Sequence, residues 1–248
     1  MKKLLAFDLD DTLSIAKVTI DPKMSQIFGR LLQRFDLCVI SGAMFSQIKK
    51  QTIDALDVSD DALKRLHIMA SQGTKYWRLG DGGWNPVYQD DLSPEKVDKI
   101  FKILEESTKE AGYWCENPAG EIIENRDNTQ VTLSAIGQKA EKEAKYAWDP
   151  DHKKREAIVA IAKAKMPDME FNIGGTTSID VTMPGVNKAY GMQKLMEQTG
   201  FSKDEILFFG DMTQPGGNDY PVPEMGIDTI TVRDWEETAN VLRGILFV

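Results

Sequence analysis

Apolar runs alternate with amphipathic helical patterns along the first 80 residues. The run Lys3–Phe7 predicts a buried strand, and residues 22–35 carry apolar side chains at the i, i+3 and i+4 spacing of a helix. A second run, Leu37–Ile40, is followed by a helical pattern over Phe45–Leu56 and a strand at His67–Ala70. Strands that alternate with helices predict a doubly wound, Rossmann-like α/β fold with a parallel sheet.

The pattern changes near residue 84. Helices are predicted after the Ser93-Pro94 and Asp149-Pro150 pairs, where a polar N-cap precedes proline. The extended segments of this region are joined by short turns and lie at Tyr113–Glu116, Glu121–Asn125, Gln130–Ile136, Glu170–Ile173 and Ser178–Met183. Consecutive strands with short turns predict an antiparallel sheet backed by helices, so residues 84–184 are expected to form an inserted α+β domain.

The first pattern returns after residue 184. Two helices and two apolar strands are predicted there, at Lys188–Thr199, Ile206–Phe209, Ile227–Val232 and Trp235–Leu246. The simplest architecture is one parallel-sheet core, residues 1–83 and 185–248, that is interrupted by a cap domain, residues 84–184.

Composition narrows the function classes. The 248 residues carry a formal net charge of −9, which argues against a nucleic-acid partner because binding a phosphate backbone requires a basic surface. No apolar run reaches the length of a membrane span, and the apolar stretch near the start is too short for a signal peptide. The two cysteines, Cys38 and Cys115, lie far apart, so free thiols and a cytoplasmic location are expected.

An acidic segment, Asp8-Leu9-Asp10-Asp11-Thr12, follows the first predicted strand. Ligands of open α/β sheets bind at the carboxyl ends of strands, where one carboxylate can act as a nucleophile and a second can carry a proton. A solvated acidic turn is the alternative. An EF-hand loop does not fit, because Thr12 and Leu13 stand where that motif needs an oxygen ligand and a glycine.

Three other segments suggest the same chemistry. Ser41-Gly42 ends the second strand, Lys188 starts a helix, and Gly210-Asp211 ends an apolar strand and precedes Asn218-Asp219. Taken singly, the first could be an ordinary turn and the second a surface lysine. Taken together, they match phosphoryl transfer, in which carboxylates hold Mg²⁺ and a lysine and a hydroxyl hold the phosphoryl oxygens.

Other reaction classes fit less well. The chain contains neither the GxxxxGK[ST] pattern of a P-loop nor GxGxxG, so the expected phosphoryl donor is a phosphorylated small molecule. His67 and His152 are the only histidines, and no nucleophile elbow accompanies them. A Ser-His-Asp hydrolase is therefore not expected.

These motifs resemble the haloacid dehalogenase superfamily. Three longer segments resemble the eukaryotic-type phosphomannomutase family, which carries a type IIB cap. They are NTQVTLSAIG (128–137), FNIGGTTSIDVTMPGVNK (171–188) and ILFFGDMTQPGGNDY (206–220). The resemblance extends over core and cap.

The resemblance implies a role for each core residue. Asp8 is the nucleophile and becomes an aspartyl phosphate, while Asp10 is the general acid/base. Ser41 and Lys188 contact the phosphoryl group. The expected Mg²⁺ ligands are Asp8, the backbone carbonyl of Asp10, Asp211 and, in support, Asp219.

In the cap, the resemblance implies that Ser178 and Asp180 contact a hexose phosphate. The family's mutases hold the distal phosphate with arginines. At those positions this chain has Lys17, Arg126 (or Asp127, if a loop shifts by one residue), Gln138 with Lys139 beside it, and Lys145. The resemblance also implies a homodimer formed through the caps.

The leading hypothesis is a phosphomannomutase, an isomerase that interconverts mannose-1-phosphate and mannose-6-phosphate and that could also accept glucose phosphates. It would need a hexose bisphosphate activator. The alternatives are a sugar-phosphate phosphatase with the same Asp8 chemistry and a non-catalytic binding protein on this fold.

Overall fold

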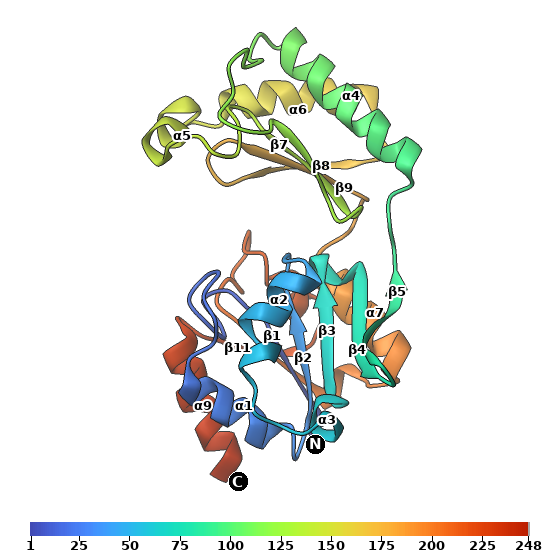
Figure 1. The fold of residues 1–248 in the computed structure, drawn as a ribbon, viewed down its shortest axis with the longest axis vertical. Coiled ribbons are helices and arrows are strands. Elements are labelled where there is room, and N and C mark those ends of the chain that lie inside the picture. The colour runs from blue at the N-terminus through green and yellow to red at the C-terminus, as the bar shows by residue number, and fades with distance from the viewer. Residues whose placement is uncertain (248) are drawn as a thin grey trace. The chain divides into compact units, whose positions relative to one another are not determined.

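The computed structural model describes residues 1–247 and divides into two units. The core unit comprises residues 1–89 together with residues from 186 onward, and the cap unit comprises residues 90–185 (Figure 1). Each unit has its own sheet and its own apolar cluster. None of the helices within residues 1–247 combines the length and apolar composition that crossing a bilayer requires.

The core sheet has the strand order β11-β10-β1-β2-β3-β4-β5 over the described residues. Its strands are β1 (Leu4–Phe7), β2 (Asp36–Ile40), β3 (Leu66–Ala70), β4 (Lys75–Gly80), β5 (Gly83–Gln89), β10 (Ile206–Gly210) and β11 (Asp228–Thr231). The strands from β11 to β3 are parallel, and β4 and β5 add an antiparallel hairpin at one edge. The predicted doubly wound parallel-sheet core is confirmed.

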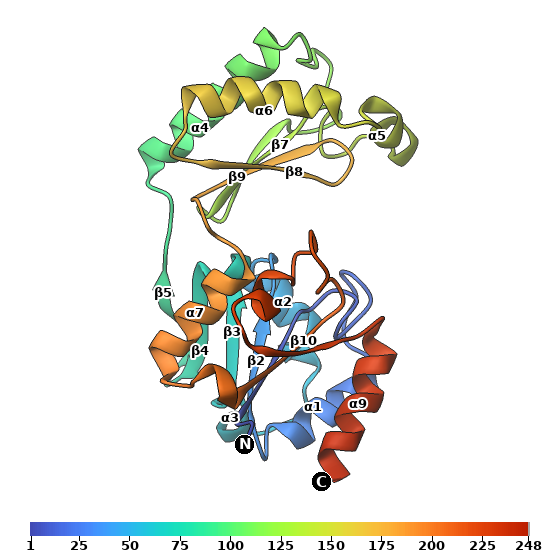
Figure 2. The ribbon, with the colours of Figure 1, turned by 180° about the vertical axis from the view of Figure 1, so that it is seen from behind.

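Helices cover both faces of this sheet (Figures 1 and 2). Alternating residues of β1 enter different clusters: Leu5 and Phe7 pack with α1 and α9, whereas Leu4 and Ala6 pack with α7. Such alternation follows from the two-residue period of a strand. The core helices are α1 (Pro22–Leu31), α2 (Phe45–Gln51), α3 (Asp60–Leu63), α7 (Lys188–Thr199), α8 (Pro221–Glu224) and α9 (Trp235–Phe247), with 3₁₀ turns at Ile53–Ala55, Ser71–Gly73 and Lys203–Glu205.

The core unit extends farther along the chain than residue 83, where the sequence pattern suggested a boundary. Residues of β5 pair with β4, for example Tyr88 with Tyr76, so this segment belongs to the core sheet. Pro86 lies within β5. Proline is tolerated at a sheet edge because its missing N–H faces no neighbouring strand, but it makes a strand difficult to recognise in a sequence. At the second boundary the units divide at 185/186, one residue from the expected point.

The cap unit is an antiparallel sheet with helices packed against its apolar side chains. The strand order is β6-β7-β9-β8, with β6 at Ile123–Arg126, β7 at Gln130–Ser134, β8 at Glu170–Gly174 and β9 at Ser178–Thr182. The helices are α4 (Pro94–Glu110), α5 (Lys142–Trp148) and α6 (Lys153–Lys165). Ile100 and Leu104 of α4 and Ile158 of α6 share a cluster with Val131 and Val181 of the sheet. The expected α+β organisation is confirmed.

Two local predictions in the cap differ from the structure. Residues 113–116, predicted as a strand, form a turn and loop after α4, where the Tyr113 N–H donates to the carbonyl of Thr108. The Tyr113 ring packs edge-on against Trp148, so this apolar side chain is partly buried by a ring contact and not by packing within a sheet. Helix α5 is not among the predicted helices, and all of its residues are at least partly exposed, so it lacks the buried apolar stripe by which a helix is recognised in a sequence.

Candidate active site

The carboxyl ends of β1 and β10 bring the first two acidic residues together. These strands are parallel neighbours in which Phe7 is level with Phe209, and the Asp8 N–H donates to the Phe209 carbonyl at 2.9 Å. Asp8 therefore leaves β1 at the height where Asp211 follows β10. The rings of Phe7 and Phe209 stack with centroids 4.9 Å apart beneath this edge, which fixes the two strand ends against each other.

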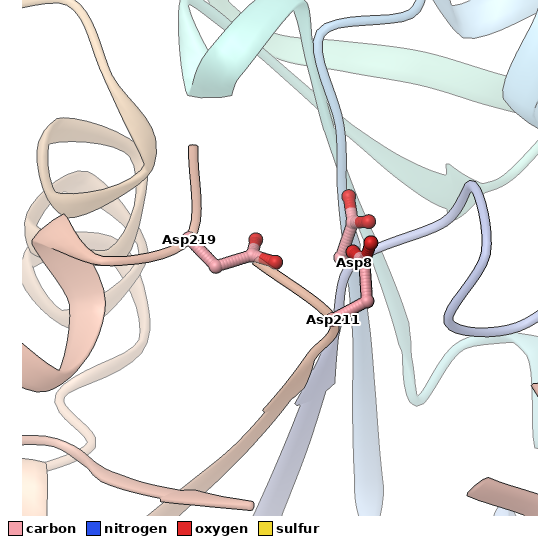
Figure 3. Close-up of side chains that lie close together, drawn as sticks. All are labelled: Asp8, Asp211 and Asp219. Carbon is pink, nitrogen blue, oxygen red and sulfur yellow. The ribbon is translucent and has the colours of Figure 1, made fainter. Parts of the chain in front are cut away.

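Asp219 completes a group of three carboxylates. One oxygen each from Asp8, Asp211 and Asp219 lies within 4.8 Å of the others. Figure 3 shows these three side chains close together. The loop that carries Asp219 is closed by two bonds: its carboxylate accepts the Met212 N–H at 3.0 Å, and its own N–H donates to the Met212 carbonyl at 3.1 Å. Gly210 is required here, because a Cβ at that position would lie 2.5 Å from Oδ2 of Asp219.

Lys188 bridges two of these carboxylates. Its side chain is fully buried, and Nζ donates to Asp8 and to Asp219. Lys188 is the first residue of α7, whose start is capped by the Asn187 side chain. A Cβ on Gly73 would lie 2.2 Å from Cα of Gly191, so this pair of glycines allows α7 to pack closely on the turn after β3. That close packing sets the height of Lys188 beside the acids.

The charges of this group do not balance. Three carboxylates against one ammonium leave two uncompensated negative charges when all are ionised. Burial raises the pKa of Asp8 to about 6, even though the Lys188 ammonium acts in the opposite direction. Burial and the charge of Asp219 also raise the pKa of Asp211. Burial would lower the pKa of Lys188, but Asp8 and Asp219 outweigh it and raise that pKa.

These observations fit a divalent cation. Mg²⁺ binds hard oxygen ligands, usually one or two carboxylates together with substrate phosphate, and its two charges equal the deficit of the site. The residues that could hold it are Asp8, Asp211 and Asp219.

Asp10 and Ser41 follow the ends of two neighbouring strands, β1 and β2. Oδ1 of Asp10 accepts the Lys17 N–H at 2.8 Å and the Gln51 side-chain amide at 3.1 Å. Oγ of Ser41 accepts the Ala43 N–H at 3.1 Å, and the side chain is nearly buried. Lys17 is itself exposed and is held through its backbone.

Ser178 and Asp180 lie two residues apart on β9, so they share one face of the cap sheet. Asp180 is paired with Thr132 of β7, whose hydroxyl donates to Oδ1 of Asp180 at 2.7 Å. Ser178 is paired with Ser134. The alternate residues of these strands, such as Ile179 and Leu133, point to the opposite face and belong to the apolar cluster. The face that carries Ser178 and Asp180 is therefore polar along the paired residues of β7 and β9.

Two basic residues of the cap, Arg126 and Lys145, belong to one chain of hydrogen bonds. Nε of Arg126 donates to Glu124 at 3.3 Å, and the Gln138 side chain donates to the same Glu124 oxygen. Lys145 donates to the Gln138 carbonyl at 2.6 Å. The structure therefore connects Arg126 with Lys145 through Gln138 and Glu124, and it places Lys17 separately, in the core unit.

Sequence reasoning missed two members of these networks. Gln51 appeared only as part of an amphipathic helix, although a glutamine at a buried helical position is an unusual choice. Glu124 appeared only within an extended segment, two residues before Arg126, a spacing that places both on one face of a strand.

The sequence of the chain is similar to those of known proteins. Residues 24–248 match the model of the family described as eukaryotic phosphomannomutase. The phosphomannomutase of Saccharomyces cerevisiae is 29% identical over 225 residues, which cover 88% of this chain and 84% of that protein. Phosphomannomutase 1 of Homo sapiens is 28% identical over 225 residues, with 88% and 82% covered.

Solved structures show the same fold. A haloacid dehalogenase-like hydrolase from Bacteroides thetaiotaomicron matches with a TM-score of 0.67 at 15% identity, over 99% of this chain and 100% of that one. An IMP-nucleotidase of Plasmodium falciparum matches with a TM-score of 0.67 at 18% identity, over 100% of this chain and 68% of that one. Because the family model spans most of its length, the chain belongs to the eukaryotic phosphomannomutase family.

Proposed function

We propose that this protein is a Mg²⁺-dependent phosphomannomutase that interconverts mannose-1-phosphate and mannose-6-phosphate, with glucose phosphates as further substrates. One observation carries the proposal: Asp8 is grouped with two other carboxylates and is bound by the buried ammonium of Lys188. Membership of the phosphomannomutase family supports the choice of substrate.

Asp8 acts as the nucleophile. Lys188 binds Oδ1 of Asp8, so the second oxygen is the one that attacks phosphorus. A bond forms between that oxygen and phosphorus, the bond from phosphorus to the sugar oxygen breaks, and Asp10 gives its proton to the departing oxygen. Lys188 stays charged throughout and stabilises the negative charge of the transferring group, together with the hydroxyl of Ser41.

The reverse transfer completes isomerisation. Asp10 takes a proton from a hydroxyl of the hexose phosphate as that oxygen attacks the aspartyl phosphate, which yields a hexose bisphosphate. The bisphosphate reorients in the site, so that its other phosphoryl group is transferred to Asp8. A hexose bisphosphate activator is needed because it loads Asp8 with the first phosphoryl group.

The metal ligands in this proposal are Asp8, Asp211 and the backbone carbonyl of Asp10, with Asp219 in support. When bound, Mg²⁺ would reduce the repulsion between the Asp8 carboxylate and the phosphoryl oxygens and orient them for in-line attack.

The cap supplies recognition of the sugar. We assign Ser178 and Asp180 to its hydroxyls, since a polar strand face with paired donors and acceptors suits a polyol. Arg126 and Lys145, with Lys17 from the core unit, are assigned to the distal phosphate. Ser178, Asp180, Arg126 and Lys145 all lie in the cap unit.

A sugar-phosphate phosphatase is the second candidate. The favouring observation is that Glu124 binds both Arg126 and Gln138, which takes up part of the positive charge that a distal phosphate needs. In that case water, deprotonated by Asp10, attacks the aspartyl phosphate and releases inorganic phosphate.

The remaining features of the proposal concern partners and location. The expected small-molecule partner is a phosphorylated sugar, and neither nucleic acid nor membrane is expected to bind. The expected protein partner is a second copy of the chain, bound through the cap. We infer a cytoplasmic setting, which suits the free thiols of Cys38 and Cys115.

The deciding experiment supplies mannose-1-phosphate, Mg²⁺ and a catalytic amount of glucose-1,6-bisphosphate, and follows the products by phosphorus NMR. Mannose-6-phosphate without inorganic phosphate supports the mutase. Inorganic phosphate alone identifies the phosphatase, and no reaction rejects both.

A matched pair of variants assigns the chemistry. Asp8→Asn should lower turnover by about a thousandfold or more, because an amide does not replace the nucleophile. Asp11→Asn changes an exposed acid of the same loop and should keep turnover near the wild-type rate. Full activity in Asp8→Asn would contradict the aspartyl phosphate.

A further inference from the structure

Gln51 links helix α2 to the loop that carries Asp10. It is the last residue of α2 and is 3% exposed. Its side-chain Nε2 donates to Oδ1 of Asp10 at 3.1 Å and lies 3.3 Å from the carbonyl of Val18. Its backbone carbonyl accepts the Ile20 N–H at 2.8 Å. One buried residue thus holds the loop at three points between residues 10 and 20.

The bonds to Asp10 are directional. The Lys17 N–H, at 2.8 Å, and the Gln51 amide both donate to the same oxygen, Oδ1. Lys17 adopts a left-handed backbone conformation with φ of 63°, which an ordinary side chain adopts only at a cost. Two donors on one oxygen restrict rotation of the carboxyl group and leave its other oxygen, Oδ2, outside these two bonds.

The Gln51 amide is itself held in one orientation. Nε2 of Gln47, one turn earlier on α2, donates to Oε1 of Gln51 at 2.9 Å. With its oxygen accepting from Gln47, the amide presents its NH₂ group to Asp10, which can only accept when ionised. The order of donors runs from Gln47 through Gln51 to Asp10.

We infer that Gln51 is a positioning residue, which holds Asp10 so that Oδ2 is presented for proton transfer. This inference rests on the proposed function, in which Asp10 protonates the departing sugar oxygen and deprotonates the attacking hydroxyl. Proton transfer requires the two oxygens to lie within hydrogen-bond reach in a defined direction. A carboxyl group that can rotate meets this condition for a smaller fraction of the time.

The chemistry of the leaving group provides a selective test. A sugar alkoxide leaves poorly without a proton, whereas p-nitrophenolate leaves without one. Misplacing Asp10 should therefore slow phosphoryl transfer between Asp8 and the sugar oxygens during isomerisation of mannose-1-phosphate, but not phosphorylation of Asp8 by p-nitrophenyl phosphate. Hydrolysis of the aspartyl phosphate that p-nitrophenyl phosphate leaves behind needs Asp10 as a base, so it should slow as well.

The variant is Gln51→Met, which keeps the length and packing of the side chain and removes the donor. We expect kcat for mannose-1-phosphate to fall about 10- to 100-fold, within the range of general acid/base catalysis, and KM to stay within about twofold. With p-nitrophenyl phosphate, the first turnover should stay within about threefold of wild type and later turnovers should slow. A burst of one equivalent of nitrophenolate is the expected signature.

Two further variants control for the packing of the helix. Lys50→Met places the same side chain at the adjacent exposed position of α2 and should behave as wild type. Gln47→Met removes only the bond that orients the Gln51 amide. It should therefore lower kcat for mannose-1-phosphate selectively as well, but by less than Gln51→Met does. It also serves as the test if Gln51→Met does not fold.

The outcomes separate the two proposals. Equal losses of the first turnover with both phosphate esters, or no loss with either, would overturn the positioning role while leaving the proposed function in place. A wild-type protein that releases no product from either ester would overturn the proposed function, and the role of Gln51 with it.

Discussion

Arg155 and Asp149 form a completely buried ion pair in the cap unit, with Nε of Arg155 2.7 Å from Oδ2 of Asp149. The same guanidinium donates to the carbonyls of Gly174 at 2.9 Å and Gly175 at 3.0 Å. Gly174 ends β8 and Gly175 begins the turn that leads to β9, whose first residue is Ser178. The ion pair therefore connects the start of α6 to the turn that leads into the polar strand β9.

Removing one partner of this pair should destabilise the cap strongly. Arg155→Met leaves the Asp149 carboxylate buried without its cation and frees two carbonyls, a change that costs about 3–5 kcal/mol in comparable buried pairs. Urea unfolding followed by tryptophan fluorescence measures the loss. Lys153→Met, on the same helix with an exposed side chain, should change the free energy of unfolding by less than about 0.5 kcal/mol. A small effect of Arg155→Met would show that the pair is dispensable.

The same pair predicts how stability depends on pH. Burial would raise the pKa of Asp149, but hydrogen bonds from Arg155 and from the Lys154 and Arg155 N–H groups outweigh it and hold that pKa below its ordinary value of 3.8. An acid whose pKa is lowered by folding binds protons less readily in the folded state, so its contribution is complete above about pH 5 and is lost as pH falls below 4. Asp149→Asn should be less stable than wild type at pH 7, with the difference shrinking at pH 3. A constant difference would contradict this assignment.

Mg²⁺ should stabilise the core against heat. Binding to the folded state alone contributes about 2.7 kcal/mol at a concentration one hundred times Kd. Asp211→Asn removes one ligand and part of the negative charge, so its melting temperature should rise much less with added Mg²⁺, and EDTA should abolish the rise in wild type. Asp11→Asn should respond to Mg²⁺ as wild type does. An equal rise in the Asp211 variant would exclude this carboxylate as a ligand.

The basic chain of the cap should separate isomerisation from simple ester cleavage. Lys145→Ala and Arg126→Ala each remove a positive charge that is assigned to the distal phosphate. Because charge-assisted hydrogen bonds are lost, the rate of isomerisation should fall about 10- to 100-fold. Turnover of p-nitrophenyl phosphate, which has no distal phosphate, should fall by less than about threefold. Lys142→Ala, also on α5 and outside this chain of bonds, is the matched control. Equal losses on both substrates would count against the mutase.

Much of the core site was predictable because a strong local signal coincides with a simple rule of topology. Apolar runs that end in acids, before Asp8 and before Asp211, indicate parallel strands, and the carboxyl ends of parallel strands meet at one edge. The turn residues around Asp219 and the helix start at Lys188 are also recognisable from local sequence. Once the order of the strands is known, Asp8 and Asp211 are expected at the same edge of the sheet.

The residues that were missed act through contacts that cross the sequence. Gln51 reaches Asp10 over 41 positions, and no pattern in the sequence around residue 51 predicts which group its side chain contacts. Glu124 lies on β6 and contacts Gln138 in the segment after β7, 14 positions later in the sequence. The segment at 113–116, wrongly predicted as a strand, shows the same limit, since the Tyr113 ring packs edge-on against Trp148 at the end of α5, 35 positions away.

The order of strands also governs when the chain can fold during synthesis. β1 sits between β2 and β10, and Lys188 lies 180 positions beyond Asp8. A ribosome-bound chain can therefore complete the cap sheet, whose strands all lie before residue 183, while β1 still exposes one unpaired edge. Unpaired edges invite association with other chains, so the period between translation of β1 and of β10 is when this protein is most exposed to aggregation.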